Sequence, residues 1–168
     1  KICIATGSRK HCYSEFVSDT APVLISMDAC VEIADKDGDY TTRLEELYTG
    51  DGVRPRNLTG AAVIRSVLLP LRREFRTVFS KLRQRQSLDF TSLTTAITTD
   101  QTGKIKIVLG GVDPRPVVVE GTNGSDREEM IRQALKHARA IDNEMFSRNY
   151  RREMIKVFLR RGFDQLMG

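Results

Sequence analysis

Residues 91–112, TSLTTAITTDQTGKIKIVLGGV, contain the pattern that decides the fold. The first nine residues are rich in β-branched residues, with five Thr and one Ile, and such side chains favour strands. From Lys104 charged and apolar residues begin to alternate, as they do in a half-buried strand, and Asp100-Gln101-Thr102-Gly103 has the composition of a turn. The stretch therefore predicts two strands joined in an antiparallel hairpin.

The segments on both sides of this hairpin predict the rest of an antiparallel sheet and two helices. FRTVFSKLR (75–83) alternates weakly and predicts a strand, while VDPRPVVVEG (112–121) is extended because its prolines exclude a helix. From Ser125 the apolar residues recur with a helical period, and Ser147 can cap a last helix. The second half is therefore expected to be an α+β sandwich, with a sheet packed against helices.

The last helix is expected to be amphipathic. Its predicted apolar side consists of Tyr150, Met154, Val157, Phe158 and Phe163. Its predicted basic side consists of Arg151, Arg152, Lys156, Arg160 and Arg161. A solvated basic face, or a face for an acidic partner subunit, is the interpretation of this pattern.

The first half predicts a smaller unit. ACVEIAD (29–35) alternates as a strand does, Asp37-Gly38 predicts a hairpin turn, and AAVIRSVLLP (61–70) predicts a further strand. The character of the chain changes after Pro70, so we expect one unit over 1–70, incomplete by itself, and a second over 71–168.

Composition excludes several classes of protein. No apolar run approaches the roughly 18–20 residues that cross a membrane, and nothing resembles a secretion signal. The net charge of +5 does not indicate a nucleic-acid binder, because the basic residues interleave with acidic and apolar ones. Three cysteines are an odd count, which favours a reducing cytoplasm over a disulfide framework.

The usual catalytic signatures are missing from the sequence. It contains no Walker loop, no GxGxxG and no GxSxG motif. His11 and His137 have no Asp or Ser at a spacing that indicates a triad, so both are expected to face solvent. No residue is therefore predicted to be catalytic.

Two stretches are candidates for ligand binding. Ser18-Asp19-Thr20-Ala21-Pro22 predicts a helix start, capped by Asp19 or Thr20, where free N–H groups attract an anion and Asp19 suits a ribityl or ribose hydroxyl. A plain helix cap explains the same pattern. In KLRQRQSLDF (81–90), Lys81, Arg83 and Arg85 recur at period two, which on a strand gives one cationic face for a dinucleotide or an acidic partner. A solvent-exposed strand explains that spacing equally well.

Cys3 and Cys12 form a pair near the start, KICIATGSRKHC. A disulfide, half of a metal site and chance are all open for this pair. Because the first residue is Lys1 and not Met, we expect a fragment or a processed chain.

Five ordered motifs together resemble the FAD-binding subunit of the molybdenum hydroxylase (xanthine dehydrogenase) family. They are CYSEFVSDTAPVLISMDACVEI (12–33), LEELYTGDGVRP (44–55), IRSVLLP (64–70), KLRQRQSLDF (81–90) and YRREMIKVFLRR (150–161). The resemblance implies the C-terminal part of a longer subunit: a partial FAD-binding domain, then a domain like the C-terminal one of the carbon monoxide dehydrogenase flavoprotein. The family's glycine-rich N-terminal flavin half is not in this sequence.

The resemblance also implies roles for five residues in holding FAD. Ser18 and Asp19 match the family's pair near the ribityl and phosphate groups. Val63 and Ile64 match residues beside the isoalloxazine ring, and Lys81 matches a lysine near the flavin edge.

Within the family, the cysteine spacing resembles the 4-hydroxybenzoyl-CoA reductase β subunit, which implies that Cys3 and Cys12 are two ligands of a [4Fe–4S] cluster. The other two thiolates would lie upstream of Lys1, and coincidence is the alternative. The family implies electron transfer with a [2Fe–2S] small subunit and a molybdopterin-binding large subunit, with ferredoxin or NAD as external electron partner. An ordinary xanthine or carbon monoxide dehydrogenase-like flavin subunit is the first alternative, and a non-catalytic assembly module that docks partner subunits is the second.

Overall fold

The structure is a computed structural model that describes residues 2–71 and 74–167. Its elements, in chain order, are α1 (Ala21–Ser26), β1 (Cys30–Asp35), β2 (Gly38–Arg43), the 3-10 helix η1 (Leu44–Leu47), β3 (Val63–Leu68), β4 (Phe75–Leu82), β5 (Leu93–Asp100), β6 (Lys104–Gly110), β7 (Val117–Thr122), α2 (Arg127–His137) and α3 (Arg148–Met167).

The predicted hairpin is confirmed as β5 and β6, which form the centre of a four-stranded antiparallel sheet of order β4-β5-β6-β7. At its turn the Asp100 carboxylate accepts hydrogen bonds from the N–H groups of Thr102 and Lys104, at 2.9 and 3.1 Å. Gly103 has φ of +81°, a conformation that favours glycine. Both strands are almost entirely buried, so this hairpin forms the core of the larger sheet.

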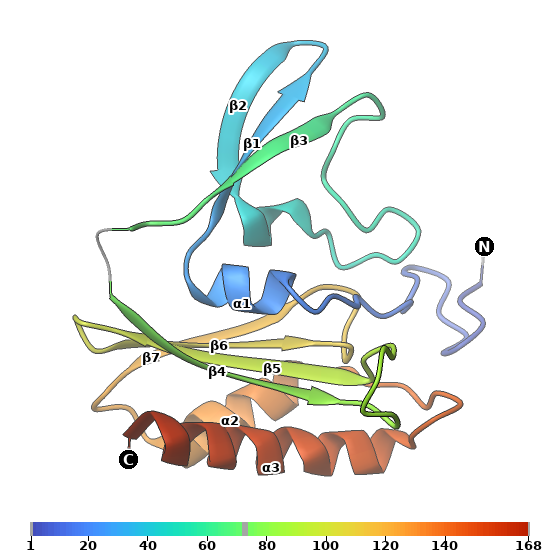
Figure 1. The fold of residues 1–168 in the computed structure, drawn as a ribbon. Coiled ribbons are helices and arrows are strands. Elements are labelled where there is room, and N and C mark those ends of the chain that lie inside the picture. The colour runs from blue at the N-terminus through green and yellow to red at the C-terminus, as the bar shows by residue number, and fades with distance from the viewer. Residues whose placement is uncertain (1, 72–73, 168) are drawn as a thin grey trace.

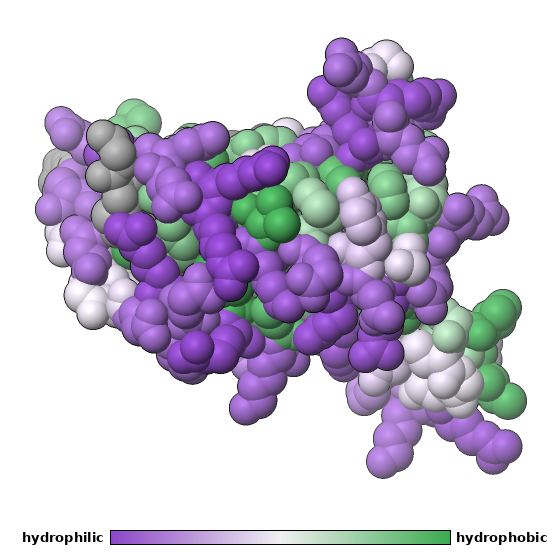
Figure 2. Space-filling model, turned by 90° about the horizontal axis from the view of Figure 1, so that it is seen from below, coloured by the Kyte–Doolittle hydropathy of each residue, from purple (hydrophilic) through white to green (hydrophobic). Residues whose placement is uncertain are grey.

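The fold consists of layers (Figure 1). Helices α2 and α3 cover one face of the four-stranded sheet, and α1 packs against β5 and β6 on the other face. The smaller sheet, of order β2-β1-β3, lies beyond α1. Seen from the side of α2 and α3, hydrophilic side chains cover most of the surface, and hydrophobic residues are visible between them (Figure 2). The predicted α+β class is therefore confirmed.

The smaller sheet has its own hydrophobic cluster. Val31 and Ile33 of β1 are fully buried and pack with Leu44 and Leu47 of η1. The predicted hairpin is confirmed, but its turn is displaced by one residue: Asp35 pairs with Gly38, so the turn is Lys36-Asp37 and Gly38 begins β2. Val108 of β6 belongs to the same cluster, so the two sheets share buried surface through α1. A division into 1–70 and 71–168 falls in the connection between β3 and β4 and stays a prediction.

The expected basic face of the last helix is wrong at Arg151, which is 0% exposed. Its guanidinium is satisfied by the backbone carbonyls of Ser92 and Ile141, at 3.0 and 2.6 Å, and of Gly111, and by the Glu15 carboxylate at 2.8 Å. The buried stripe of α3 consists of Arg151, Ile155, Leu159, Gly162, Phe163 and Leu166. Tyr150, expected on the apolar side, is exposed.

The helix starts differ in detail from expectation. In α1, neither Asp19 nor Thr20 caps the backbone; the Ser18 hydroxyl accepts a hydrogen bond from the Ala21 N–H at 3.0 Å. In α2, Asp126 is the cap residue and accepts from the Glu128 N–H at 3.0 Å. Ser147 is confirmed at the start of α3, where its hydroxyl accepts from the Tyr150 N–H at 3.2 Å.

Candidate functional site

The structure joins Asp19 and Lys81, two residues that the sequence placed in separate candidate stretches. The Lys81 ammonium lies 2.7 Å from the Asp19 carboxylate and donates to the Asp89 carbonyl oxygen at 2.8 Å. Lys81 is near the end of β4, and its side chain is only 14% exposed. This cation is therefore fixed in position beside the start of α1.

The three-cation strand face predicted for Lys81, Arg83 and Arg85 is wrong, because β4 ends at Leu82 and the two arginines lie in the following loop. Asp89 organises that loop: its carboxylate accepts from the N–H groups of Gln84 and Arg85. The hydrogen bond from the Arg85 guanidinium is the main cause that lowers the pKa of Asp89 to about 2. These contacts fix the shape of the loop, and the ion pair of Lys81 with Asp19 links its base to the segment before α1.

A pocket of about 480 Å³ lies between this loop and the segment before α1. It is lined by Val17, Ser18, Asp19, Arg85, Leu88, Asp89, Phe90 and Thr91. The Thr91 hydroxyl is buried and has no hydrogen-bond partner within the described part of the chain. Leu88 and Phe90 are strongly exposed, although both are apolar. The pocket thus offers open apolar surface beside the exposed carboxylate of Asp19 to a ligand.

Val63 and Ile64 lie on β3, an edge strand of the smaller sheet, and not in this pocket. They are 61% and 40% exposed, so apolar surface is open on this strand. Val63 pairs with Ala34 and Ile64 with Ile33, and consecutive residues of a strand point to opposite faces of the sheet. A flat ring on one face of the sheet therefore contacts one of the two side chains.

Cys3 and Cys12 line one pocket of about 560 Å³, together with His11 and Asp51. The Cys3 thiol is buried and accepts a hydrogen bond from the Tyr13 N–H at 3.4 Å. Hydrogen bonds from the Thr6 hydroxyl and the Tyr13 N–H lower the pKa of Cys3 to about 7. The thiolate is the metal-binding form of cysteine. In the described ranges, no three or more His, Cys, Asp or Glu residues form a group that could hold a metal ion.

The two histidines face solvent, as the sequence predicted, and both line pockets. Within residues 2–71 and 74–167, no helix is long and apolar enough to cross a membrane.

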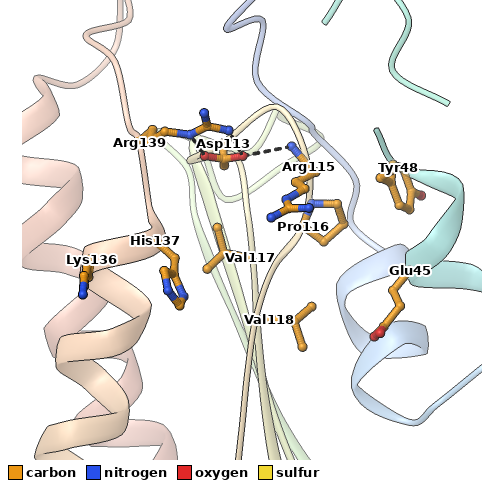
Figure 3. A pocket seen from close by; sticks show the side chains of 10 residues that line it. All are labelled: Glu45, Tyr48, Asp113, Arg115, Pro116, Val117, Val118, Lys136, His137 and Arg139. Atoms are coloured by element: carbon orange, nitrogen blue, oxygen red, sulfur yellow. Dashed lines mark hydrogen bonds and ion pairs between the residues drawn. The ribbon is translucent and has the colours of Figure 1, made fainter. Parts of the chain in front are cut away.

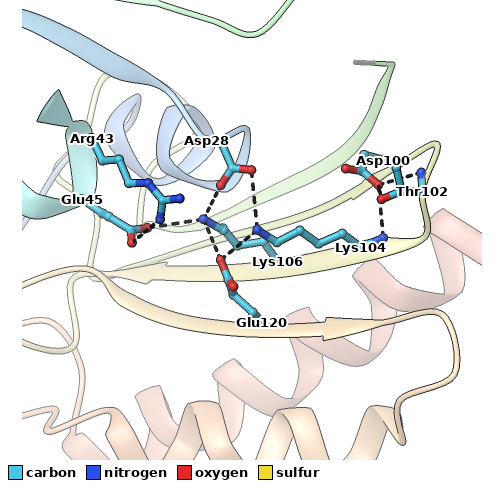
Figure 4. Close-up of polar contacts among 8 residues, drawn as sticks. All are labelled: Asp28, Arg43, Glu45, Asp100, Thr102, Lys104, Lys106 and Glu120. Atoms are coloured by element: carbon cyan, nitrogen blue, oxygen red, sulfur yellow. Dashed lines mark hydrogen bonds and ion pairs between the residues drawn. The ribbon is translucent and has the colours of Figure 1, made fainter. Parts of the chain in front are cut away.

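Sequence reasoning missed the ion network around Lys106 (Figure 4). The Lys106 ammonium is 2.5 Å from Asp28 and 2.9 Å from Glu120, and its side chain is 3% exposed. Burial acts to lower the pKa of Lys106, but its hydrogen bonds to Asp28 and Glu120 raise it overall. The sequence placed Lys106 in an alternating strand, and only the fold brings Asp28, Glu45 and Glu120 around it.

No family model matches the chain. Its fold is similar to that of several solved proteins. A chain of quinoline 2-oxidoreductase from Pseudomonas putida 86 aligns over 91% of this chain and 57% of its own length, at 15% identity and a TM-score of 0.72. A chain of the Cu,Mo-CO dehydrogenase aligns over 87% and 55%, at 17% identity and a TM-score of 0.73. A chain of carbon monoxide dehydrogenase from Hydrogenophaga pseudoflava aligns over 88% and 55%, at 14% identity and a TM-score of 0.71.

These alignments show a shared α+β fold, including the CO dehydrogenase-like arrangement expected from the sequence. The chain spans 55–57% of the length of these chains.

Proposed function

We propose that the chain is part of an FAD-binding electron-transfer subunit of a heteromeric, molybdenum-containing oxidoreductase. The observation that carries the proposal is the contact between Asp19 and Lys81, which lie 62 residues apart. Both were assigned to FAD from motifs alone. The likeness in fold to a chain of a Cu,Mo-CO dehydrogenase supports the same family.

The residues at the pocket beside α1 fit a flavin nucleotide. The carboxylate of Asp19 is exposed at this pocket and can accept a hydrogen bond from a ribityl hydroxyl. Helix α1 has six residues and its Ala21 N–H already donates to Ser18, so its start offers little to a phosphate. The structure therefore favours a hydroxyl of the ligand over an anion at Asp19.

The bound flavin supplies one- and two-electron transfer, and the protein tunes it through nearby charge. The Lys81 ammonium contacts the Asp19 carboxylate and the Asp89 carbonyl oxygen, and these two contacts fix its position. A fixed cation at the edge of the flavin ring stabilises the negative charge that the ring gains on reduction. Val63 and Ile64 lie outside this pocket, on the smaller sheet, and one of them would give an apolar contact to a ring that reaches β3.

The finer assignment is to a subunit like that of 4-hydroxybenzoyl-CoA reductase. Cys3 and Cys12 share a pocket, and the low pKa of Cys3 suits a thiolate ligand. In this proposal the chain provides two of the four ligands of a [4Fe–4S] cluster. The partners are a [2Fe–2S] small subunit and a molybdopterin-binding large subunit, with ferredoxin or NAD as electron partner in the cytoplasm. A xanthine or carbon monoxide dehydrogenase-like flavin subunit is the alternative that needs no such cluster.

The test is the flavin content of the natural protein that contains this chain. Purified protein should show the visible flavin absorption bands and release FAD on denaturation. Lys81→Met should lower the reduction potential of the bound flavin or its content, since the fixed cation is lost. Arg83→Met is the matched control, because among the described residues the Arg83 side chain donates only to the Ser87 carbonyl in its own loop. A natural protein without flavin would favour the assembly module instead.

A further inference from the structure

A second pocket of about 550 Å³ lies between the end of α2 and the 3-10 helix η1, with β7 as its floor (Figure 3). Its volume is in the range of small-molecule sites. It is lined by Glu45, Tyr48, Asp113, Arg115, Pro116, Val117, Val118, Lys136, His137 and Arg139. None of these residues belongs to the set proposed for FAD.

The two carboxylates of this pocket already have cationic partners. Asp113 accepts two hydrogen bonds from the Arg139 guanidinium, at 2.6 and 2.9 Å. Glu45 lies 3.4 Å from the Lys106 ammonium and 3.8 Å from the guanidinium of Arg43. The acidic groups therefore do not neutralise the other cations of the lining.

Two cations of the lining remain available. Among the described residues, neither the Arg115 guanidinium nor the Lys136 ammonium forms a hydrogen bond or an ion pair. Figure 3 shows His137 at the end of α2, across Val117 and Val118 from Glu45 and Tyr48, with Lys136 beside His137 on the side away from Arg115. The pocket thus has an excess of positive charge.

The end of α2 does not offset this charge. A helix C-terminus carries partial negative charge on its last carbonyl groups. Here the Arg152 guanidinium donates to the carbonyl oxygens of Leu135 and Ala138, both at 3.0 Å. The negative end of the helix is therefore compensated from the side of α3, and an anion in the pocket meets little repulsion from it.

Apolar surface lies between the cations and the far wall. Val117 is buried and Val118 is half-buried on the floor, beside Pro116. The ring of Tyr48 is fixed by an edge contact with Phe16, with ring centroids 4.7 Å apart. A ligand that fills this pocket needs an apolar body as well as an anionic group.

We propose that this pocket binds a small organic anion, with its phosphate or carboxylate group on Arg115 and its apolar body against Val117, Val118 and Tyr48. Arg115 can bind either head group through two parallel hydrogen bonds, and the positive charge of Lys136 acts from the other side of the pocket. Because the lining comes from η1, β7 and α2, the ligand also links the smaller sheet to the larger one.

Calorimetric titration of the purified protein with phenyl phosphate tests the proposal, with benzoate as the carboxylate probe. Inorganic phosphate has the anionic group but no apolar body, and benzyl alcohol has the apolar ring but no anionic group. Each should therefore bind more weakly than phenyl phosphate or benzoate. Arg115→Gln should weaken binding of the preferred organic anion about tenfold or more, the loss expected for a charge-assisted hydrogen bond, and Lys136→Gln should weaken it less. Arg161→Gln, an exposed arginine on α3, is the matched control and should bind as the natural protein does.

Absence of binding by both organic anions overturns the proposal. So does binding that Arg115→Gln and Lys136→Gln leave unchanged. Both substituted residues are exposed, so unchanged melting temperatures will show that the variants are folded. Flavin content is a separate readout, so failure of this proposal and failure of the FAD proposal can be distinguished.

Discussion

The guanidinium of Arg151 donates a hydrogen bond of 2.8 Å to the carboxylate of Glu15, and joins the first turn of the last helix to the N-terminal segment. The same guanidinium binds the carbonyl of Gly111, the residue whose N–H donates to the Phe16 carbonyl at 2.7 Å. Three distant parts of the chain therefore meet at one buried cation.

Arg151→Met should destabilise the protein strongly. The substitution leaves the Glu15 carboxylate and three backbone carbonyls without their donor in a buried place. Removal of one partner of a buried ion pair costs about 3–5 kcal/mol of unfolding free energy. Urea denaturation measures the loss, and Arg161→Met is the surface control, expected within about 0.5 kcal/mol of the natural protein. Equal stabilities of the two variants would refute the structural role of Arg151.

Glu15→Gln should change how stability depends on pH. Burial raises the pKa of Glu15 above its usual 4.5, and the opposing charge of Arg151 does not cancel this effect. Asp113, which also faces Glu15, raises the pKa further. A carboxyl with a raised pKa in the folded state binds its proton more tightly there, so its contribution to stability falls as pH rises from 4.5 through the folded pKa. The natural protein should therefore lose stability relative to Glu15→Gln across this window. Thermal melts of both proteins at closely spaced pH values measure this. A difference in melting temperature that stays constant across the window would contradict the prediction.

Lys106→Met should cost about 3 kcal/mol or more, because it leaves the carboxylates of Asp28, Glu45 and Glu120 together without their central cation. The hydrogen bond from Lys106 is the main cause of the lowered pKa of Glu120. A lowered carboxyl pKa contributes stability above the unfolded value, which is lost as pH falls through the folded pKa. The gap in stability between natural protein and variant should therefore narrow below about pH 4.5.

Lys104→Met is the matched control for this network. Lys104 lies 3.2 Å from Glu120 and 3.6 Å from Asp28, but its side chain is far more exposed than that of Lys106. Urea titrations should show a smaller loss for Lys104→Met. A loss as large as that of Lys106→Met would show that burial of the central cation does not decide the stability of the network.

Local patterns in the sequence predicted the fold well, since alternation, turn composition and helical period act between near neighbours. The hairpin of β5 and β6, the hairpin of β1 and β2 to within one residue of its turn, and the start of α3 at Ser147 were all found in this way. Arg151 was misplaced because its partners lie 10 to 136 residues away. A charged residue on a helical pattern looks solvated until the tertiary structure supplies those partners.

The sequence likewise predicted some residues of the candidate site and missed others. The motifs named Asp19 and Lys81, and the structure brings them together. The spacing of Lys81, Arg83 and Arg85 predicted one strand face, but β4 ends before Arg83 and Asp89 draws the loop around itself. Thr91 was missed, because a buried hydroxyl without a partner is a property of the packed structure.

Val63→Asp and Ile64→Asp should differ in their effect on flavin content. The two side chains point to opposite faces of the smaller sheet, so a carboxylate at one position meets the ring and a carboxylate at the other does not. Burial of an unpaired carboxylate against the ring would oppose binding. The flavin-to-protein absorbance ratio of the purified variants measures this. Equal flavin content in both variants would remove β3 from the proposed ring contact.

Cys12→Ser should remove iron and acid-labile sulfide from the natural protein that contains this chain. Serine lacks the thiolate that a [4Fe–4S] cluster requires, and a cluster with three protein thiolates is less firmly held. Cys30→Ser is the control, because Cys30 is a half-buried residue of β1 and does not line the pocket of Cys3 and Cys12. The iron of the [2Fe–2S] clusters in the small subunit is subtracted from the total iron. The iron lost in Cys12→Ser should then correspond to one cluster. Unchanged iron in Cys12→Ser would instead assign this cysteine pair to coincidence and favour the xanthine or carbon monoxide dehydrogenase-like subunit.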